Sequence, residues 1–303
     1  MVGFIEILNT LYPLIYIKNS IFMCIINTMA KYKIRRSLVK IINRFPSLAN
    51  YMRTIRDKND YKSIAEMTQW GFTIAGNKEM ASGKYEPPET ELFRCLVKDM
   101  DVMINIGANV GYYCCHALSL NIPVIAVEPI ARNYNYLMRN IRDNGWANQA
   151  EIFPLAVGKC TDIVEIWGGG TAASLIKGWA SIPENYRTTV PVITLDRILG
   201  ASLDGKRALI LVDIEGAEYM MLQGAKKCLV NSPRPTWIIE ISTFEHQPDQ
   251  KMNPNLLKTF KIMFDSGYEA FTADESLSKI NMIQIEKVIK QESKFKTHNF
   301  LFK

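Results

Sequence analysis

The stretch from Asp101 to Tyr113, DVMINIGANVGYY, constrains the fold of this chain more than any other. Its apolar run at residues 102–106 predicts a buried strand. Gly107 and Gly111 follow in a turn, where glycine permits positive φ and a close approach of backbone or ligand. Residues 112–120 then predict a helix. A strand, a glycine turn and a helix in succession form the opening unit of a nucleotide-binding α/β fold.

A carboxylate follows at the position where such a fold binds a ribose. Residues 124–127 predict a second buried strand, and Glu128 ends it, 21 residues after Gly107. An acid about 20 residues beyond the glycine turn is placed to accept hydrogen bonds from ribose hydroxyls. The sequence therefore predicts that Glu128 binds the ribose of the cofactor.

The glycine pattern distinguishes between cofactors. A dinucleotide site needs three glycines, one of which gives the pyrophosphate close access. Here the spacing is G-x-N-x-G, with Asn109 in the middle, and no phosphate-binding lysine follows. The turn favours an adenosine ligand without phosphate, of which S-adenosylmethionine is the common one. A nicotinamide-dependent oxidoreductase that uses the same turn is the alternative.

Five motifs in order extend this prediction: NIGANVGYY, AVEP (126–129), LAVG (155–158), TLD (194–196) and LVDIEGAE (211–218). With them the chain resembles the FkbM family of S-adenosylmethionine-dependent methyltransferases over roughly residues 82–241. The resemblance implies a doubly wound α/β fold with seven mostly parallel strands, the last antiparallel. It also implies methyl transfer to a hydroxyl oxygen of a sugar, a glycan or another hydroxylated metabolite.

Two positions depart from the family's usual pattern. The family usually has aspartate where Asn105 stands and lysine where Leu211 stands. These departures leave open a second alternative, a non-catalytic module that keeps the methyltransferase fold and binds a membrane or a partner protein.

The cofactor site is expected at the carboxyl ends of the strands, where open parallel sheets bind ligands. We assign Ala156 and Val157 to the adenine environment and Asn105 to the cofactor's amino-acid end. Glu86 ends a G-x-Y-E turn similar to one in the family, which would bring it beside the cofactor or the substrate. The predicted cofactor-binding residues are Glu86, Asn105, Gly107, Asn109, Gly111, Glu128, Ala156 and Val157.

The catalytic group is expected on the neighbouring strand. Residues 209–212 predict a strand that ends at Asp213, and a helix is expected from Glu215. Methyl transfer to a hydroxyl requires alignment of the acceptor and removal of its proton. Asp213 is the first candidate for this role, with Glu215, Glu240 and His246 in reserve. The glycine-rich loop at residues 168–171 is a candidate substrate flap.

Charge and cysteine usage narrow the function classes. Residues 1–60 hold ten Lys or Arg and three acids, whereas the rest of the chain is near neutral. A core without basic surplus argues against nucleic-acid binding. The six cysteines form no C-x-x-C pair and have no histidine at zinc spacing, so we predict no metal site and buried thiols in a reducing, cytoplasmic compartment.

The N-terminal extension, residues 1–81, precedes the methyltransferase domain expected at 82–303. Its apolar stretch at residues 4–30 contains Pro13 and a central Lys18, which disfavour a membrane span. A basic amphipathic helix is expected over residues 34–45, with Pro46 at its end. We predict that residues 1–46 contact the inner membrane surface peripherally. Packing on the core or a dimer contact is the alternative, and the oligomeric state stays open.

The end of the chain is expected to complete the sheet. Phe271 and Ile283 mark two last strands that pair at its edge, and residues 287–303 are expected to form an irregular basic tail.

Overall fold

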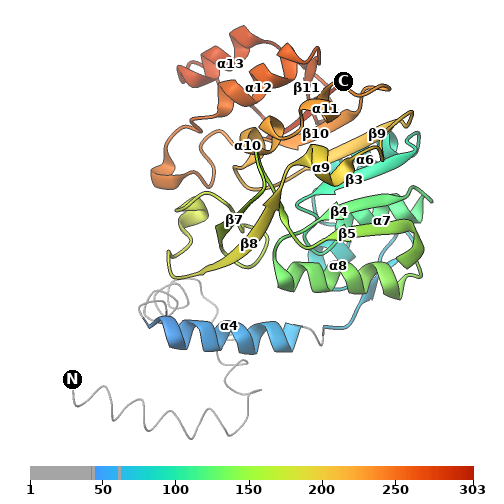
Figure 1. Cartoon of the computed structure of the whole chain (residues 1–303), viewed down its shortest axis with the longest axis vertical. Helices are drawn as coiled ribbons and strands as arrows, with labels where there is room; N and C mark the ends of the chain where they lie inside the picture. The colour runs from blue at the N-terminus through green and yellow to red at the C-terminus, as the bar shows by residue number, and fades with distance from the viewer. Residues whose placement is uncertain (1–41, 43–44, 61–62) are drawn as a thin grey trace, which may run out of the picture. The chain divides into compact units, whose positions relative to one another are not determined.

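The computed structural model describes residue 42, residues 45–60 and residues 63–303 (Figure 1). The chain divides into two compact units, residues 1–56 and 57–303. Helix α4 (Pro46–Asp60) begins at Pro46, which was predicted to end a helix. Proline suits a first helical position because its missing N–H would have no partner there. No helix in the described ranges is long and apolar enough to span a membrane. The predicted membrane contact falls mainly on residues 1–41, outside the described ranges.

The second unit is built on an eight-stranded sheet in the order β12-β11-β13-β10-β9-β3-β4-β5. The five strands from β10 to β5 are mutually parallel. β13 pairs antiparallel with both β10 and β11. In chain order the strands are β3 (Val102–Ile106), β4 (Val124–Val127), β5 (Ala150–Phe153), β9 (Ala208–Val212), β10 (Thr236–Glu240), β11 (Ala270–Thr272), β12 (Lys279–Ile280) and β13 (Asn299–Phe302).

Helices cover both faces of this sheet, as the doubly wound prediction requires (Figure 1). Apolar side chains of α6 (Pro87–Val97), α7 (Tyr112–Ser119) and α8 (Ala131–Asp143) pack on one face. The other face carries α9 (Leu195–Leu199), α10 (Glu218–Gln223), α11 (Lys226–Leu229), α12 (Leu256–Asp265) and α13 (Met282–Ile289). Every residue of β3 and β9 is therefore buried, which explains why β9 is entirely apolar and β3 is apolar except for Asn105. The predicted fold class is confirmed.

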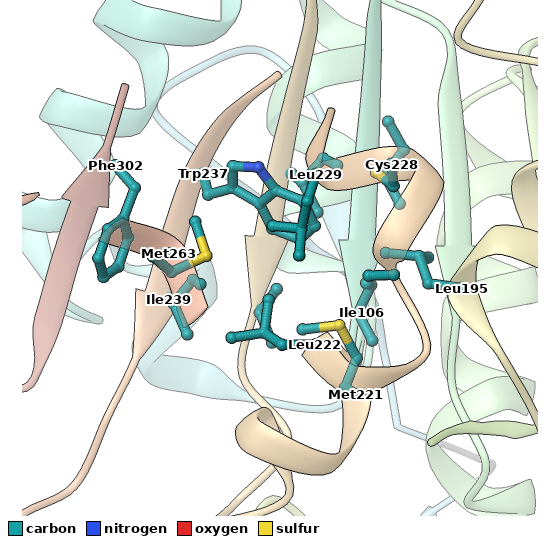
Figure 2. Packing of buried hydrophobic residues seen from close by; sticks show 14 of the residues in the cluster. Ile106, Leu195, Met221, Leu222, Cys228, Leu229, Trp237, Ile239, Met263 and Phe302 are labelled. Carbon is teal, nitrogen blue, oxygen red and sulfur yellow. The ribbon is translucent and has the colours of Figure 1, made fainter. Parts of the chain in front are cut away.

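The larger core cluster fixes the strands that lead to the site. The indole N–H of Trp237 donates to the hydroxyl of Tyr268, which satisfies the one polar atom of this fully buried ring. Figure 2 shows Ile106, Trp237 and Ile239 of the strands among Met221, Leu222, Leu229 and Met263 of the helices. Rigid strands hold the residues at their carboxyl ends in defined positions.

Three predictions for the end of the sheet are wrong. The sheet has eight strands instead of seven. Ile283 lies in α13, whose start is fixed by a capping box between Asn281 and Gln284. The expected irregular tail contains β13, which inserts between β10 and β11. Its apolar Phe300, Leu301 and Phe302 are buried because both faces are covered, whereas the basic residues before them resemble a solvated tail.

A small three-stranded sheet stands beside the large one. It contains β6 (Ala156–Val157), β7 (Asp162–Trp167) and β8 (Arg187–Ile193), in the order β6-β8-β7. β7 pairs antiparallel with β8, so the hairpin strand expected at residues 163–167 is confirmed. The connection between β7 and β8 contains the glycine-rich loop.

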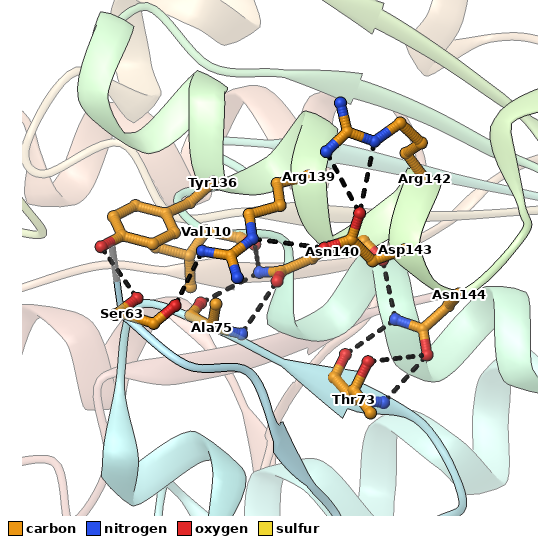
Figure 3. A network of polar contacts seen from close by, with 10 residues as sticks. All are labelled: Ser63, Thr73, Ala75, Val110, Tyr136, Arg139, Asn140, Arg142, Asp143 and Asn144. Carbon is orange, nitrogen blue, oxygen red and sulfur yellow. Dashed lines mark hydrogen bonds and ion pairs between the residues drawn. The ribbon is translucent and has the colours of Figure 1, made fainter. Parts of the chain in front are cut away.

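Residues 63–81 pack onto the same unit. They form β1 (Glu66–Met67), β2 (Thr73–Ile74) and the short α5 (Lys78–Ala81). Asn140 of α8 exchanges hydrogen bonds with the backbone of Ala75 and donates to the carbonyl of Val110, and Asn144 similarly holds Thr73 (Figure 3). Asn140 of α8 therefore connects the end of β2 with the turn after β3.

Three of the described cysteines fit the prediction of buried thiols. Cys114, Cys115 and Cys228 are buried, whereas Cys95 and Cys160 are exposed. Burial raises the pKa of Cys114 and Cys228 to about 12, so these thiols stay protonated and unreactive.

Candidate active site

The glycine turn after β3 packs directly against the end of β9. Gly107 has a φ of +85°, and a Cβ at this position would collide with the carbonyl oxygen of Asp213. The amides of Gly107 and Ala108 both donate to the carbonyl of Val127 at the end of β4. The sequence needs glycine here because three strand ends converge on one turn.

Glu128 is held beside this turn by its own hydrogen bonds. Its Oε2 accepts from the amide of Asn109 at 2.8 Å, and its Oε1 accepts from the amide of Ile130 at 2.9 Å. Oε1 also accepts from the Asn133 side-chain amide at 3.3 Å. Burial raises the pKa of Glu128 to about 7, although these hydrogen bonds favour the ionised form. A carboxylate offers about four acceptor positions, so one remains on Oε2.

A first hollow of about 550 Å³ opens between Glu128 and the end of β9. Five of the predicted cofactor residues line it: Gly107, Asn109, Glu128, Ala156 and Val157. Its wall also contains Gly170 and Thr171, so the predicted substrate flap borders this hollow.

A second hollow of about 380 Å³ lies on the other side of Asp213. Four acidic residues line it: Glu86, Glu89, Asp213 and Glu240. Tyr113 donates to Oε2 of Glu86 at 2.8 Å, and the remaining wall is mostly apolar. Asp213 lines both hollows, which makes it the shared residue of the site.

The acids around Asp213 cannot all be ionised at neutral pH. Oδ1 of Asp213 is buried and, within the described part of the chain, accepts no hydrogen bond. Burial, followed by the charges of Glu240 and Glu215, raises the pKa of Asp213 well above its usual range. Burial and the charge of Glu215 raise the pKa of Glu240 to about 8, although a hydrogen bond with Asp213 opposes this. The two carboxyls titrate as a pair that holds a proton near neutral pH.

Glu215, which lines the first hollow, contacts His246 and Trp179. The carboxylate of Glu215 accepts from the indole N–H of Trp179 at 2.6 Å and lies 3.2 Å from Nδ1 of His246. Glu215 lines the first hollow, whereas the half-exposed His246 lines neither. Trp179 also packs over Gly216, where any Cβ would collide with its ring.

The helix expected from Glu215 begins three residues later, at Glu218. Glu215 and Gly216 adopt φ values of +53° and +95°, in the left-handed region. Oε1 of Glu218 accepts from the amide of Gly216 at 2.8 Å and so closes this turn. The DIEGAE motif is thus a loop that presents Asp213 and Glu215 before the helix starts.

Two predicted cofactor residues lie outside the lining of both hollows. Asn105 is buried, and its side-chain amide donates to Sγ of Cys114 at 3.4 Å. Gly111 precedes α7 with a φ of +90°, and a Cβ there would collide with Leu137. Asn105 and Leu211, the two departures from the family pattern, are paired neighbours on β3 and β9. An acidic and a basic position have therefore both become neutral at one place.

Sequence reasoning missed Asn133 and Trp179. Asn133 lies in the first turn of α8, five residues after Glu128, and its polar side chain among buried positions was the available signal. Trp179 follows Gly178 in a loop, and nothing in its sequence position indicated the contact with Glu215. In the described residues, no three His, Cys, Asp or Glu side chains form a group that could hold a metal ion.

No curated protein matches this chain. An FkbM methyltransferase of Methylobacillus flagellatus KT matches at 15% identity and a TM-score of 0.42, over 89% of this chain and 60% of that one. A Bacillus cereus O-methyltransferase in complex with SAH matches at 11% identity and a TM-score of 0.40, over 74% and 83% of the two chains.

Aeropyrum pernix fibrillarin with bound S-adenosyl-L-methionine matches at 13% identity and a TM-score of 0.36, over 68% of this chain and 67% of that one. At these scores the structural likenesses carry no argument of their own. The family model of the methyltransferase FkbM domain matches residues 105–270, more than half of the chain. That match begins in β3, contains every residue that lines the first hollow and ends at β11. On this match the chain belongs to the FkbM methyltransferase family.

Proposed function

We propose that the protein transfers a methyl group from S-adenosylmethionine to a hydroxyl oxygen of a sugar, a glycan or another hydroxylated metabolite. The observation that carries this proposal is the position of Asp213. It stands at the carboxyl end of β9, lines both hollows and presents a buried oxygen that accepts no hydrogen bond in the described part of the chain.

The residues around the first hollow suit an adenosine cofactor. Glu128 keeps one acceptor position for a ribose hydroxyl, and Ala156 and Val157 give an apolar wall. Asn109 lies in its wall, where a dinucleotide site has the glycine that gives the pyrophosphate close access. This composition favours S-adenosylmethionine over a nicotinamide cofactor.

The second hollow suits the acceptor because it adjoins the first at Asp213. When bound, S-adenosylmethionine supplies a methyl group that its sulfonium makes electrophilic. Its positive charge would lower the pKa of Asp213 and Glu240 and so favour a free carboxylate. Asp213 would then take the acceptor's hydroxyl proton as the oxygen forms its bond to the methyl carbon and the carbon–sulfur bond breaks. Glu240 would share the proton with Asp213.

The first test follows transfer of label from methyl-labelled S-adenosylmethionine to a panel of sugars, glycans and hydroxylated metabolites. We expect a labelled product with the wild-type protein. In Asp213→Asn the turnover should fall by about 10²-fold or more, the usual effect of losing a general base. The affinity for S-adenosylhomocysteine should change little, because the shape of the side chain is kept.

Asp265→Asn is the matched control, since this exposed aspartate pairs with Lys261 on the surface of α12. Near-normal turnover in Asp213→Asn would assign the base to Glu240. Binding of NADH in place of S-adenosylhomocysteine would favour the oxidoreductase alternative. Binding of S-adenosylhomocysteine without turnover on any acceptor would favour the non-catalytic module.

A further inference from the structure

Asn133 is a buried polar residue that faces the first hollow from α8. Only 2% of its surface is exposed. Its side-chain Nδ2 donates to Oε1 of Glu128 and to the carbonyl oxygen of Gly170, each at 3.3 Å. Both partners can only accept hydrogen bonds when Glu128 is ionised. The amide nitrogen must therefore face them, and this fixes the orientation of the whole side chain.

The other polar atom of this amide is the oxygen Oδ1. It is buried and, among the described residues, receives no hydrogen bond. A buried acceptor without a donor is unfavourable, because it has lost its water and gained nothing in exchange. Asn133 lines the first hollow together with Glu128, Ile130 and Gly170. A donor from a ligand in this hollow would relieve the cost.

The hydrogen bonds of Glu128 indicate which donor that is. Oε1 of Glu128 already accepts from the amide of Ile130 and from Asn133, whereas Oε2 accepts only from the amide of Asn109. Each carboxylate oxygen has about two acceptor positions. Glu128 can therefore accept one ribose hydroxyl, through Oε2, and the neighbouring hydroxyl needs another acceptor close by.

We infer that Asn133 is a second ribose-binding residue, whose Oδ1 accepts the hydroxyl that Glu128 cannot take. This inference rests on the proposed adenosine cofactor. Oδ1 of Asn133 would accept a hydrogen bond from the ribose, while its Nδ2 donates to Glu128 and to the carbonyl of Gly170 and holds both in place. The glycine-rich loop would thus be tied to the bound ribose through one side chain.

The test measures affinities by calorimetry for the wild-type and Asn133→Leu proteins. The ligands are S-adenosylhomocysteine, its 2′-deoxy and 3′-deoxy analogues, and an analogue that lacks the amino group of adenine. In the wild type, removing either hydroxyl should weaken binding roughly tenfold. In Asn133→Leu, one of the two deoxy analogues should bind as well as the parent compound, and the other should keep its tenfold loss. The loss of the adenine amine should have the same effect in both proteins.

Asn135→Leu, on the exposed face of the same helix, is the control and should reproduce every wild-type affinity. Asn133→Ala, which also lacks the acceptor, gives the same comparison if the leucine variant does not fold, which thermal melting would reveal. The inference is overturned if each deoxy analogue loses the same affinity in the wild type and in the variant. It is also overturned if the variant changes only the effect of removing the adenine amine. If wild-type protein does not bind S-adenosylhomocysteine at all, the proposed function fails as well.

Discussion

Glu128 combines three hydrogen bonds with a raised pKa, and this combination makes ligand binding sensitive to pH. Burial raises its pKa to about 7, so the carboxyl is partly protonated at neutral pH. A ribose hydroxyl that donates to Oε2 favours the ionised form and lowers this pKa. Binding must therefore release a proton below about pH 7, and affinity should fall there as the pH falls.

We predict that the dissociation constant for S-adenosylhomocysteine rises by up to about tenfold per unit as the pH falls from about 7 to 6. Glu128→Gln should remove this dependence and weaken binding at pH 8 by at least about tenfold, because a hydrogen bond to a charged acceptor contributes about 1.5–3 kcal/mol. Calorimetry across this range checks both effects. Glu151→Gln, an exposed acid on β5, should behave as wild type. A flat profile in the wild type would remove Glu128 from the ribose site.

At the scale of elements, the neighbouring strands β3 and β9 carry a linked change of charge. Asn105 and Leu211 are direct partners across the parallel pair, and the side chains of both belong to the same buried face. The family's usual aspartate and lysine would face each other at these positions. A buried charge is tolerated only with a partner, so the two neutral residues can replace the pair only together.

We predict that Asn105→Asp alone costs about 2–4 kcal/mol of stability, because it buries an unpaired charge. Leu211→Lys alone should cost less, because Leu211 lines the second hollow, where the carboxyls of Glu86, Asp213 and Glu240 can pair with an ammonium. The double variant should cost less than the sum of the two by at least about 1 kcal/mol. Urea denaturation of the four proteins measures this coupling. Additive costs would mean that the two side chains do not interact.

The sequence predicted elements well where burial was strong and poorly where local geometry depends on distant contacts. β3, β9 and β10 were predicted because strands covered on both faces have mostly apolar sequences. The start of α10 was misplaced because the turn before it depends on Trp179, which comes from a loop far away in the sequence. β13 was missed because only its insertion between two strands buries Phe300 and Phe302.

The same limit applies to the site. Glu128 and Asp213 were predicted because each follows the carboxyl end of a strand. The carboxyl ends of parallel strands lie at one edge of the sheet, where ligands bind. The sequence could not show that Asp213 separates two hollows or that Asn133 orients Glu128. These relations depend on side-chain directions that follow only from the packed helices.

For the whole molecule, burial of acids should decide how stability changes with pH. Burial raises the pKa of Glu128 and of Glu218 to about 7 and contributes most to raising that of Glu240 to about 8, from ordinary values near 4.5. Between these values the folded protein binds more protons than the unfolded chain. The stability that these three acids contribute is fully present below about pH 4.5 and is lost as the pH rises toward 8. Asp101, whose pKa is lowered to about 2 by its hydrogen bonds with Arg207, titrates below this window.

We therefore predict that the melting temperature, measured without ligand, falls by several degrees between about pH 5.5 and pH 8.5. Glu240→Gln should reduce this fall because it removes the acid whose pKa is the highest of the three, whereas Glu275→Gln, at an exposed acid, should leave it unchanged. Saturating S-adenosylmethionine should flatten the profile further, since its positive charge favours the ionised carboxyls around the first hollow. A melting temperature that stays constant or rises with pH would show that these carboxyls are ionised in the folded protein and that the acidic site is held by other means.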